Sequence, residues 1–245
     1  MYLITGSQGQ LGTELSKLLP QAIRTDVKTL DITDATAVKN FVTAHNVDTI
    51  INCAAYTAVD KAEDDLELAA KINIDGPRNL AESGAKIIHI STDYVFDGTG
   101  YKPYEPEDKA NPVSVYGKTK LAGEQAVFEK AREAVIIRTA WLYSPYGNNF
   151  VKTMRKLGIE RESLNVVCDQ IGTPTCAADL AAAIVKIIPQ MNEQNKGVYH
   201  FTNEGVCSWY DFAHEIMALS GISCRVNPIP SSAYPTKAKR PFYSV

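Results

Sequence analysis

Apolar and amphipathic segments alternate along the first part of this chain. Short runs rich in Val, Ile and Ala have the length and composition of strands buried in a parallel sheet. The segments between them place apolar residues on one helix face, as Leu11, Leu15 and Leu18 illustrate. The predicted strands are residues 2–5, 21–26, 48–55, 85–91 and 134–142. Strands and helices in this alternation predict right-handed βαβ units and a doubly wound parallel sheet, which is an α/β fold.

The pattern becomes less regular after Tyr143. Residues 144–149 interrupt it with Ser, Pro, Gly and Asn, and shorter elements follow. The expected elements are helices at 150–157, 177–188 and 208–219 and strands at 164–167 and 198–201. The last segment, residues 227–245, carries four prolines and has no clear periodicity. We therefore expect a main domain of residues 1–143, rejoined by 177–202, and a smaller C-terminal α/β region within residues 144–245.

A glycine turn joins the first predicted strand to the first helix. Gly6, Gly9 and Gly12 stand in the order strand, turn, helix that a dinucleotide-binding fingerprint requires. Glycines permit the tight turn and let backbone N–H groups approach a pyrophosphate, and the helix N-terminus favours its negative charge. The spacing is G-x-x-G-x-x-G, a variant of G-x-G-x-x-G. This context favours a Rossmann-like dinucleotide-binding domain over a plain turn with packing glycines.

An acidic residue follows the second predicted strand. Asp26 lies twenty residues after Gly6, where a carboxylate usually accepts hydrogen bonds from the ribose hydroxyls of an adenosine. That position favours NADH as the cofactor. Lys28 supplies a charge that suits a 2′-phosphate, so NADPH stays open. Two small residues, Ala54 and Ala55, end the third predicted strand and leave room for a cofactor.

Tyr116 and Lys120 stand four residues apart in a segment that Ser114 is placed to cap as a helix. Positions i and i+4 lie on one helix face, with Cβ atoms about 5–6 Å apart. Because an ammonium beside a phenol favours the phenolate, we expect Lys120 to lower the pKa of Tyr116 from roughly 10. The pattern by itself also fits a half-buried Tyr beside a solvated Lys. The long preceding loop, residues 98–112, and the nearby strand ends indicate a catalytic pair.

Composition and charge argue against several other classes of protein. A net charge of −3 provides no electrostatic reason to expect binding to nucleic acid or to an anionic membrane. The longest apolar runs are too short to cross a bilayer. The five cysteines include no C-x-x-C pair and the four histidines no metal-ligand spacing, so we expect no metal site. The first predicted strand begins at Tyr2, which leaves no room for a signal peptide, and we expect a cytoplasmic protein.

The motifs of the chain resemble those of one enzyme family. The glycine turn, the segment 91–96 (STDYVF) and the Tyr-x-x-x-Lys pair have the order and spacing of the extended short-chain dehydrogenase/reductase superfamily. A closer likeness is to dTDP-4-dehydrorhamnose reductases. It rests on the segments 9–12 (GQLG), 57–63 (TAVDKAE), 91–98 (STDYVFDG), 115–124 (VYGKTKLAGE), 138–141 (RTAW) and 147–150 (GNNF). Members of that family usually continue with a further helix, so we expect this chain to lack the family's C-terminal tail.

The resemblance implies reduction of the C4 ketone of dTDP-4-dehydro-β-L-rhamnose to dTDP-L-rhamnose by NADPH or NADH. Tyr116 would be the general acid, Lys120 would lower its pKa and hold the nicotinamide ribose, and Thr92 would stabilise the developing oxyanion. The implied substrate contacts are Thr92, Asp93 and Trp141. The predicted cofactor site consists of Gly6, Gly9, Gln10, Leu11, Gly12, Asp26, Asp31, Ile32, Ala55, Tyr56, Thr57, Tyr116 and Lys120. The expected partner is a dTDP-sugar, and the expected assembly is a monomer or a homodimer.

Alternative interpretations stay open at this point. The motifs also fit another nucleotide-sugar reductase or epimerase, or a non-catalytic NADP-binding relative like the regulatory subunit of methionine adenosyltransferase. Trp141 also suits a core position, and Asn148 and Asn149 suit a helix cap. The basic cluster at 237–240 suits a nucleotide pyrophosphate but is more typical of a solvated tail. The acidic residues at 60–65 fit an acidic helix start more simply than a magnesium site.

Overall fold

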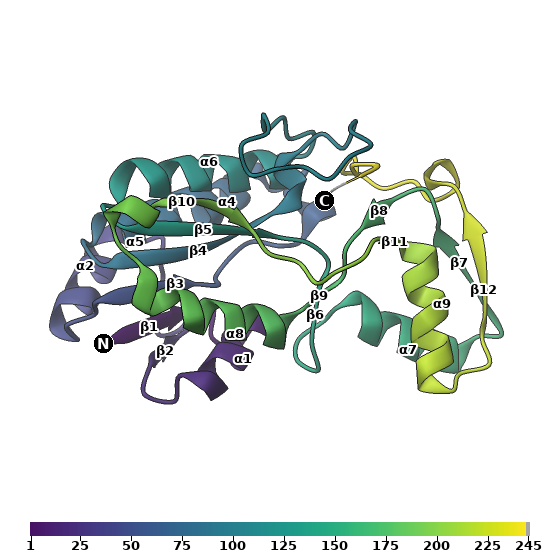
Figure 1. The fold of residues 1–245 in the computed structure, drawn as a ribbon, viewed down its shortest axis with the longest axis horizontal. Coiled ribbons are helices and arrows are strands. Elements are labelled where there is room, and N and C mark those ends of the chain that lie inside the picture. The colour runs from purple at the N-terminus through teal and green to yellow at the C-terminus, as the bar shows by residue number, and fades with distance from the viewer. Residues whose placement is uncertain (244–245) are drawn as a thin grey trace.

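A six-stranded parallel sheet forms the centre of the protein in the computed structural model, which describes residues 1–243 (Figure 1). The strand order is β10-β5-β4-β3-β1-β2, and all neighbouring strands run parallel. The strands are β1 (Tyr2–Thr5), β2 (Ile23–Thr25), β3 (Thr49–Asn52), β4 (Lys86–Thr92), β5 (Ala134–Thr139) and β10 (Gly197–His200). The chain passes from β1 to β2 on one side and then to β3 on the other. Ligands of such sheets bind outside the strands' carboxyl ends at this switch point.

Helices cover both faces of the sheet. Because side chains alternate along a strand, Leu3 packs in the core of one face and Ile4 in the core of the other. The Leu3 face is covered by α2 (Ala35–Ala44), α5 (Gly76–Glu82) and α6 (Val115–Lys130), and the Ile4 face by α1 (Gln10–Leu18) and α8 (Ala177–Ile187). This arrangement confirms the predicted doubly wound α/β fold.

Shorter helical elements complete the main domain. They are α3 (Val59–Ala62), α4 (Leu66–Ala70), a π-helical turn (Lys71–Asp75) and 3-10 turns at Asp93–Val95, Ile188–Gln190 and Glu193–Asn195; a further 3-10 turn, Ser231–Ala233, lies outside this domain near the C-terminus. The π-helical turn joins α4 to α5. It brings Asn73 so close to α6 that a Cβ at Gly123 would lie 2.1 Å from the Asn73 carbonyl oxygen. Within residues 1–243, no helix is long and apolar enough to cross a membrane.

A smaller region packs around its own core, beside the carboxyl ends of the sheet strands (Figure 1). It contains α7 (Phe150–Glu160), α9 (Trp209–Ser220), β7 (Ser163–Val167) and β12 (Arg225–Ile229). Its core includes Met154, Leu164, Ile216 and Val226. Two short strand pairs lie between it and the main sheet, β6 (Leu142–Tyr143) with β9 (Thr175–Cys176) and β8 (Ile171–Gly172) with β11 (Cys207–Ser208).

Several sequence-based boundaries differ from the structure; β3, expected to reach Ala55, ends at Asn52. The strand predicted for residues 134–142 ends at Thr139, because Trp141 has φ +47, a left-handed conformation that a strand cannot continue through. The chain then forms β6, which pairs with β9 instead of extending the main sheet. Residues 225–229 form β12 beside β7, a strand that the sequence analysis did not predict because Pro228 interrupts the pattern. Pro228 is tolerated there because β12 is an edge strand.

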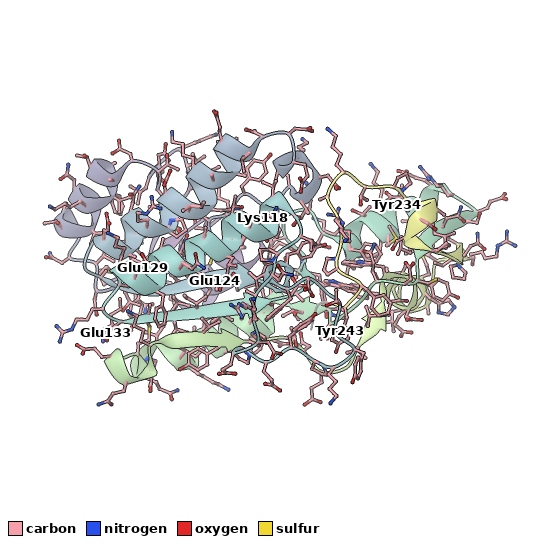
Figure 2. The ribbon with its side chains drawn as sticks, turned by 90° about the horizontal axis from the view of Figure 1, so that it is seen from above. Lys118, Glu124, Glu129, Glu133, Tyr234 and Tyr243 are labelled. Carbon is pink, nitrogen blue, oxygen red and sulfur yellow. The ribbon has the colours of Figure 1, made fainter. Side chains whose placement is uncertain are left out.

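Two features hold α6, which carries the predicted catalytic pair. Ser114 caps the helix as predicted, because its Oγ accepts a hydrogen bond of 3.1 Å from the Gly117 N–H. One turn beyond the pair, the buried Glu124 carboxylate lies 2.7 Å from the Arg138 guanidinium on β5. Figure 2 labels Glu124 and Lys118 on α6; Glu124 is buried and Lys118 is exposed. The buried ion pair therefore ties this helix to the sheet.

Candidate functional site

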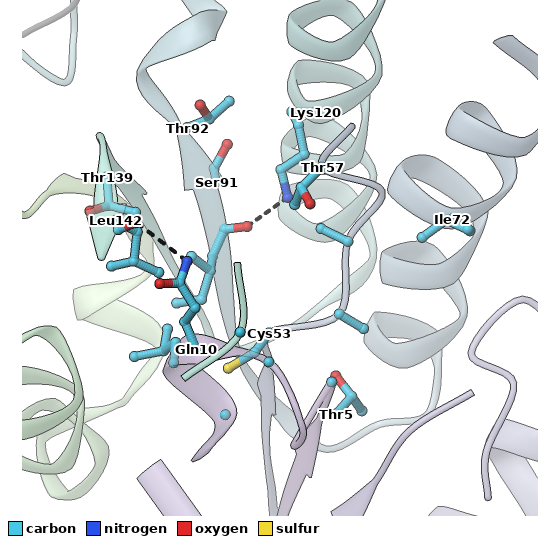
Figure 3. A pocket seen from close by; sticks show the side chains of 18 of the residues that line it. Thr5, Gln10, Cys53, Thr57, Ile72, Ser91, Thr92, Lys120, Thr139 and Leu142 are labelled. Carbon is cyan, nitrogen blue, oxygen red and sulfur yellow. Dashed lines mark hydrogen bonds between the residues drawn. The ribbon is translucent and has the colours of Figure 1, made fainter. Parts of the chain in front are cut away.

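A cavity of about 740 Å³ opens at the carboxyl ends of the sheet strands (Figure 3). Its volume lies in the range of about 300–1,000 Å³ that is usual for cofactor and substrate sites. All but one of the predicted site residues line it: Gly6, Gly9, Gln10, Leu11, Gly12, Asp26, Asp31, Ile32, Ala55, Thr57, Thr92, Asp93, Tyr116, Lys120 and Trp141. The fold thus brings one set of distant segments together, as the rule for open α/β sheets predicts.

The glycine turn between β1 and α1 has the geometry of an anion cradle. Gly6 has φ +63, and a Cβ there would lie 2.7 Å from the backbone nitrogen of Ala54. A Cβ at Gly12 would lie 2.3 Å from the Gly6 carbonyl oxygen. Gly9 is the N-cap of α1 and offers no side chain to cap it. The helix N-terminus and its backbone N–H groups are therefore suited to the pyrophosphate of a dinucleotide.

Asp26 follows β2 at the same side of the cavity. Its Oδ1 accepts hydrogen bonds from the backbone N–H groups of Lys28 (2.9 Å) and Thr29 (3.2 Å), and Gln8 donates to its Oδ2. These contacts fix the carboxylate at the position where a ribose is expected. Asp31 also lines this end of the cavity, and hydrogen bonds from the Thr33 hydroxyl and N–H lower its pKa. The adenosine end of the predicted site is thus acidic.

Tyr116 lies in the first turn of α6, with its ring edge-on to that of Tyr94 at a centroid distance of 5.6 Å. Burial raises the pKa of Tyr116 to about 12. A hydrogen bond with Thr92 opposes this rise, and the negative charge of Asp93 adds to it. The phenol is therefore protonated throughout the neutral range, which is the state that a proton donor needs.

Lys120 is buried with 2% of its surface exposed, and its Nζ donates a 2.7 Å hydrogen bond to the Ile90 carbonyl oxygen (Figure 3). Burial lowers the pKa of Lys120 to about 8, and the Glu124 carboxylate acts in the opposite direction. The expectation that Lys120 lowers the pKa of Tyr116 differs from the structure. Burial of the phenol has the largest effect on its pKa and raises it. Lys120 is not among the groups that shift the pKa of Tyr116.

Thr92 and Asp93 stand at the end of β4, next to Tyr116. The Thr92 hydroxyl donates to Asp93 Oδ1 at 2.9 Å and accepts from the Tyr94 N–H at 3.2 Å. The same hydroxyl is a hydrogen-bond partner of Tyr116. Thr92 is therefore placed beside the proton donor, but it must turn its proton away from Asp93 to serve a ligand oxygen.

Trp141 lines the cavity together with a residue that the sequence analysis did not predict, Trp209. The two rings are stacked, with centroids 3.5 Å apart and an interplanar angle of 10°. Behind Trp141, a Cβ at Gly172 would lie 2.5 Å from the indole ring. Trp209 begins α9, directly after Ser208, which forms a capping box with Asp211. The stack joins the main domain to the smaller region at the rim of the predicted sugar site.

Tyr56 is the predicted cofactor residue that does not line the cavity. Asn73 holds its backbone: Oδ1 accepts from the Tyr56 N–H at 2.9 Å, and Nδ2 donates to the Tyr56 carbonyl at 3.1 Å. Lining residues missed from the sequence include Gln8, Val59, Ser91, Tyr94, Thr139, Leu142, Asn148 and Trp209. Four of these, Gln8, Ser91, Tyr94 and Leu142, adjoin a predicted site residue in the sequence, so the same rule could have found them.

The acidic residues of α3 and the turn after it bind the C-terminal segment. Asp60 Oδ2 lies 2.7 Å from Arg240, and Asp64 pairs with Lys237. Arg240 and Lys237 therefore contact protein carboxylates, while Lys237 and Lys239 are exposed, as expected of a solvated tail. Glu63 Oε1 accepts a hydrogen bond of 2.9 Å from the N–H of the first residue of α6. Among residues 1–243, no three His, Cys, Asp or Glu side chains are arranged to hold a metal ion.

Comparison with known families agrees with this geometry. The sequence matches the RmlD substrate binding domain family over residues 1–245. The chain belongs to this family. One similar protein is the spore coat polysaccharide biosynthesis protein SpsK of Bacillus subtilis, which is 42% identical over 99% of this chain and 87% of that protein.

Solved structures of RmlD-family proteins have the same fold. A dTDP-4-dehydrorhamnose reductase from Clostridium acetobutylicum is 50% identical, with a TM-score of 0.96 over 100% of this chain and 89% of that chain. The dTDP-4-dehydrorhamnose reductase of Bacillus anthracis, solved in complex with NADP, is 44% identical, with a TM-score of 0.95 over 99% of this chain and 88% of that chain. The predictions of this reductase family and of an oxidoreductase are confirmed.

Proposed function

We propose that this protein reduces the C4 ketone of dTDP-4-dehydro-β-L-rhamnose to dTDP-L-rhamnose, with NADPH or NADH as the reductant. The observation that carries the proposal is that Tyr116, Lys120 and Thr92 share one cavity with the glycine turn. The relatives from Clostridium acetobutylicum and Bacillus anthracis, both dTDP-4-dehydrorhamnose reductases, support the same substrate. The likeness to SpsK supports a second candidate, another dTDP-sugar ketone.

The chain's own residues divide the work of a ketone reduction. The glycine turn and the N-terminus of α1 hold the pyrophosphate, and Asp26 accepts from the adenosine ribose. When bound, the nicotinamide supplies the hydride. Tyr116 donates its proton to the carbonyl oxygen, so that one hydride and one proton yield the alcohol. Thr92 donates a hydrogen bond to the developing oxyanion. Lys120 donates a hydrogen bond to the nicotinamide ribose.

The two parts of the fold have separate roles in this proposal. Residues 1–143 and 177–202 bind the dinucleotide, and the remaining residues of 144–243 mainly bind the nucleotide sugar. Asp93 and Trp141 stand where the two parts meet and contact the sugar. The strand β10 supports this division. It comes from the C-terminal part of the chain, yet it pairs with β5 in the main sheet. Cytoplasmic location and a monomeric or homodimeric assembly stay predictions.

A substrate panel tests the function directly. Oxidation of NADPH and of NADH is followed with dTDP-4-dehydro-β-L-rhamnose and with other 4-keto nucleotide sugars that differ in base or sugar. We expect dTDP-4-dehydro-β-L-rhamnose to be reduced with the highest kcat/KM. Faster reduction of another dTDP-4-keto sugar would favour the second candidate. If no ketone oxidised either cofactor while the dinucleotide still bound tightly, the protein would be a non-catalytic binding relative.

Trp209 offers a test of the sugar side of the cavity. Trp209→Ala removes a ring that lines the cavity beside Trp141, and a ring contact made with the bound ligand would contribute about 0.5–1.5 kcal/mol, as aromatic pairs do. We therefore expect KM for the nucleotide sugar to rise roughly 3- to 10-fold, with the dissociation constant of NADPH unchanged. Trp209→Phe keeps a ring at the same place and should recover most of the loss. An unaltered KM in Trp209→Ala would exclude this residue from the sugar site.

A further inference from the structure

The side chain of Gln10 connects the glycine turn to the segment that leads into the smaller region. Gln10 is the first residue of α1 and lines the cavity. Its Nε2 donates to the Leu142 carbonyl oxygen at 3.3 Å (Figure 3). Its Oε1 accepts hydrogen bonds from Asn149 Nδ2 at 2.9 Å and from the Ser144 hydroxyl at 3.3 Å. Both ends of this amide therefore bind residues 142–149, the link between the two parts of the fold.

The linking segment lies close against α1 at two further places. Gly147 has φ +59, and a Cβ there would lie 3.2 Å from Gln10 Cγ. On the next turns of α1, Lys17 Nζ lies 4.4 Å from the centre of the Tyr146 ring. Such cation–π contacts stabilise by about 0.5–1 kcal/mol at exposed sites. The segment is thus held on the helix whose N-terminus is the proposed pyrophosphate site.

The side chain of Asn149 forms hydrogen bonds with both α7 and Gln10. Its Oδ1 caps α7, since it accepts a hydrogen bond of 3.0 Å from the Lys152 N–H. Its Nδ2 donates to Gln10, and also to the Ser144 carbonyl oxygen at 2.7 Å. One planar amide therefore sets the start of α7 relative to the glycine turn. The glycine turn and the start of α7 are therefore joined through a single side chain.

The first residue of α7 connects this link to the other end of the cavity. Phe150, the first residue of α7, packs on Trp209 with ring centroids 4.5 Å apart. Trp209 in turn stacks on Trp141 at the rim of the proposed sugar site. A continuous set of contacts thus runs from the dinucleotide end of the cavity, through Gln10 and Asn149, to the sugar end.

We propose that Asn149 is a positioning residue that couples dinucleotide binding to nucleotide-sugar binding, so that each ligand increases the affinity for the other. The inference rests on the proposed function, because it takes the two ligands from there. The dinucleotide is expected at Gln10 and the nucleotide sugar at Trp141, the two ends of this set of contacts. A ligand that shifts one end shifts the other through Asn149, so the second ligand meets a site already in its bound position. The effect must be reciprocal, as linkage requires of any coupling between two binding sites.

The coupling is measured by calorimetry with NADPH and dTDP, a pair that binds without reacting. The dissociation constant of NADPH is determined without dTDP and with saturating dTDP. For the natural protein we expect NADPH to bind at least about 5-fold tighter with dTDP, the lower end of typical coupling. In Asn149→Ser the hydroxyl still caps α7, but the amide donor to Gln10 is lost. We expect the ratio of the NADPH dissociation constants without and with dTDP to fall below about 2-fold, with α7 and the fold retained.

Matched variants separate coupling from general damage. Lys156→Ala changes an exposed residue of α7 and should keep the ratio of the natural protein. Gln10→Ala removes the other half of the link and should lose the coupling to the same extent, whatever happens to the affinity for NADPH alone. A ratio of one in the natural protein, or an unchanged ratio in Asn149→Ser, overturns the proposal. Failure of dTDP to bind at all is seen in its own titration, and overturns the proposed substrate together with the inference.

Discussion

Tyr116→Phe is expected to lower kcat by about 100- to 10,000-fold, the usual range for the loss of a general acid. The substitution removes one oxygen and keeps the ring. The packing against the Tyr94 ring, whose centroid lies 5.6 Å away, should therefore be retained. The dissociation constant of NADPH should change by less than about threefold, because the glycine turn and Asp26 are untouched. Steady-state kinetics and a calorimetric titration of the same preparation give both numbers.

Tyr94→Phe is the matched comparison, since it removes a hydroxyl from the same wall of the cavity. Burial raises the pKa of both phenols; of the two, Tyr116 is the one that is hydrogen-bonded to Thr92 and lies on the same helix as Lys120. We expect its loss to cost less than about tenfold in kcat. If Tyr116→Phe kept nearly full turnover, or if Tyr94→Phe lowered kcat more than Tyr116→Phe does, Tyr116 would not be the proton donor.

The sheet and most of the cavity could be predicted because both follow from local rules. Pairs such as Leu3 and Ile4 mark strands with two buried faces, and they pack in the two cores as expected. The carboxyl ends of such strands meet at one edge, which brings the glycine turn, Thr92 and α6 together without any knowledge of side-chain contacts. The resemblance added roles to these positions, and the fold shows that they are neighbours.

What the sequence did not reveal depends on contacts between distant parts of the chain. Trp209 reaches the cavity only because the smaller region folds back against Trp141, and no local pattern connects these two rings. The left-handed backbone of Trp141 likewise cannot be seen in an apolar run. The pKa of Tyr116 was predicted in the wrong direction, since spacing along a helix reveals proximity to Lys120 but not the burial of the phenol.

Lys120→Met is expected to lower kcat by roughly 100-fold or more, as loss of one preorganised cation or donor commonly does, and yet to stabilise the fold at pH 7. Burial lowers the pKa of Lys120 from 10.5 to about 8. Below pH 8 the folded protein must therefore keep a buried charge, at a cost of roughly 3 kcal/mol relative to the unfolded chain. Methionine removes this cost and loses only the hydrogen bond to Ile90, so Tm at pH 7 should rise by a few degrees.

The sign of the pH dependence distinguishes this explanation from a simple packing effect. The folded-state pKa lies below the unfolded one, so between about pH 8 and pH 10.5 the unfolded natural protein binds more protons at Lys120 than the folded one. The natural protein should gain stability relative to Lys120→Met across this window, and the difference in Tm should shrink as the pH rises. Lys118→Met, an exposed residue of the same helix, should show no such trend. A difference for Lys120→Met that stayed constant from pH 7 to pH 10.5 would mean that the ammonium is not destabilising, because buried charge, unlike packing, titrates.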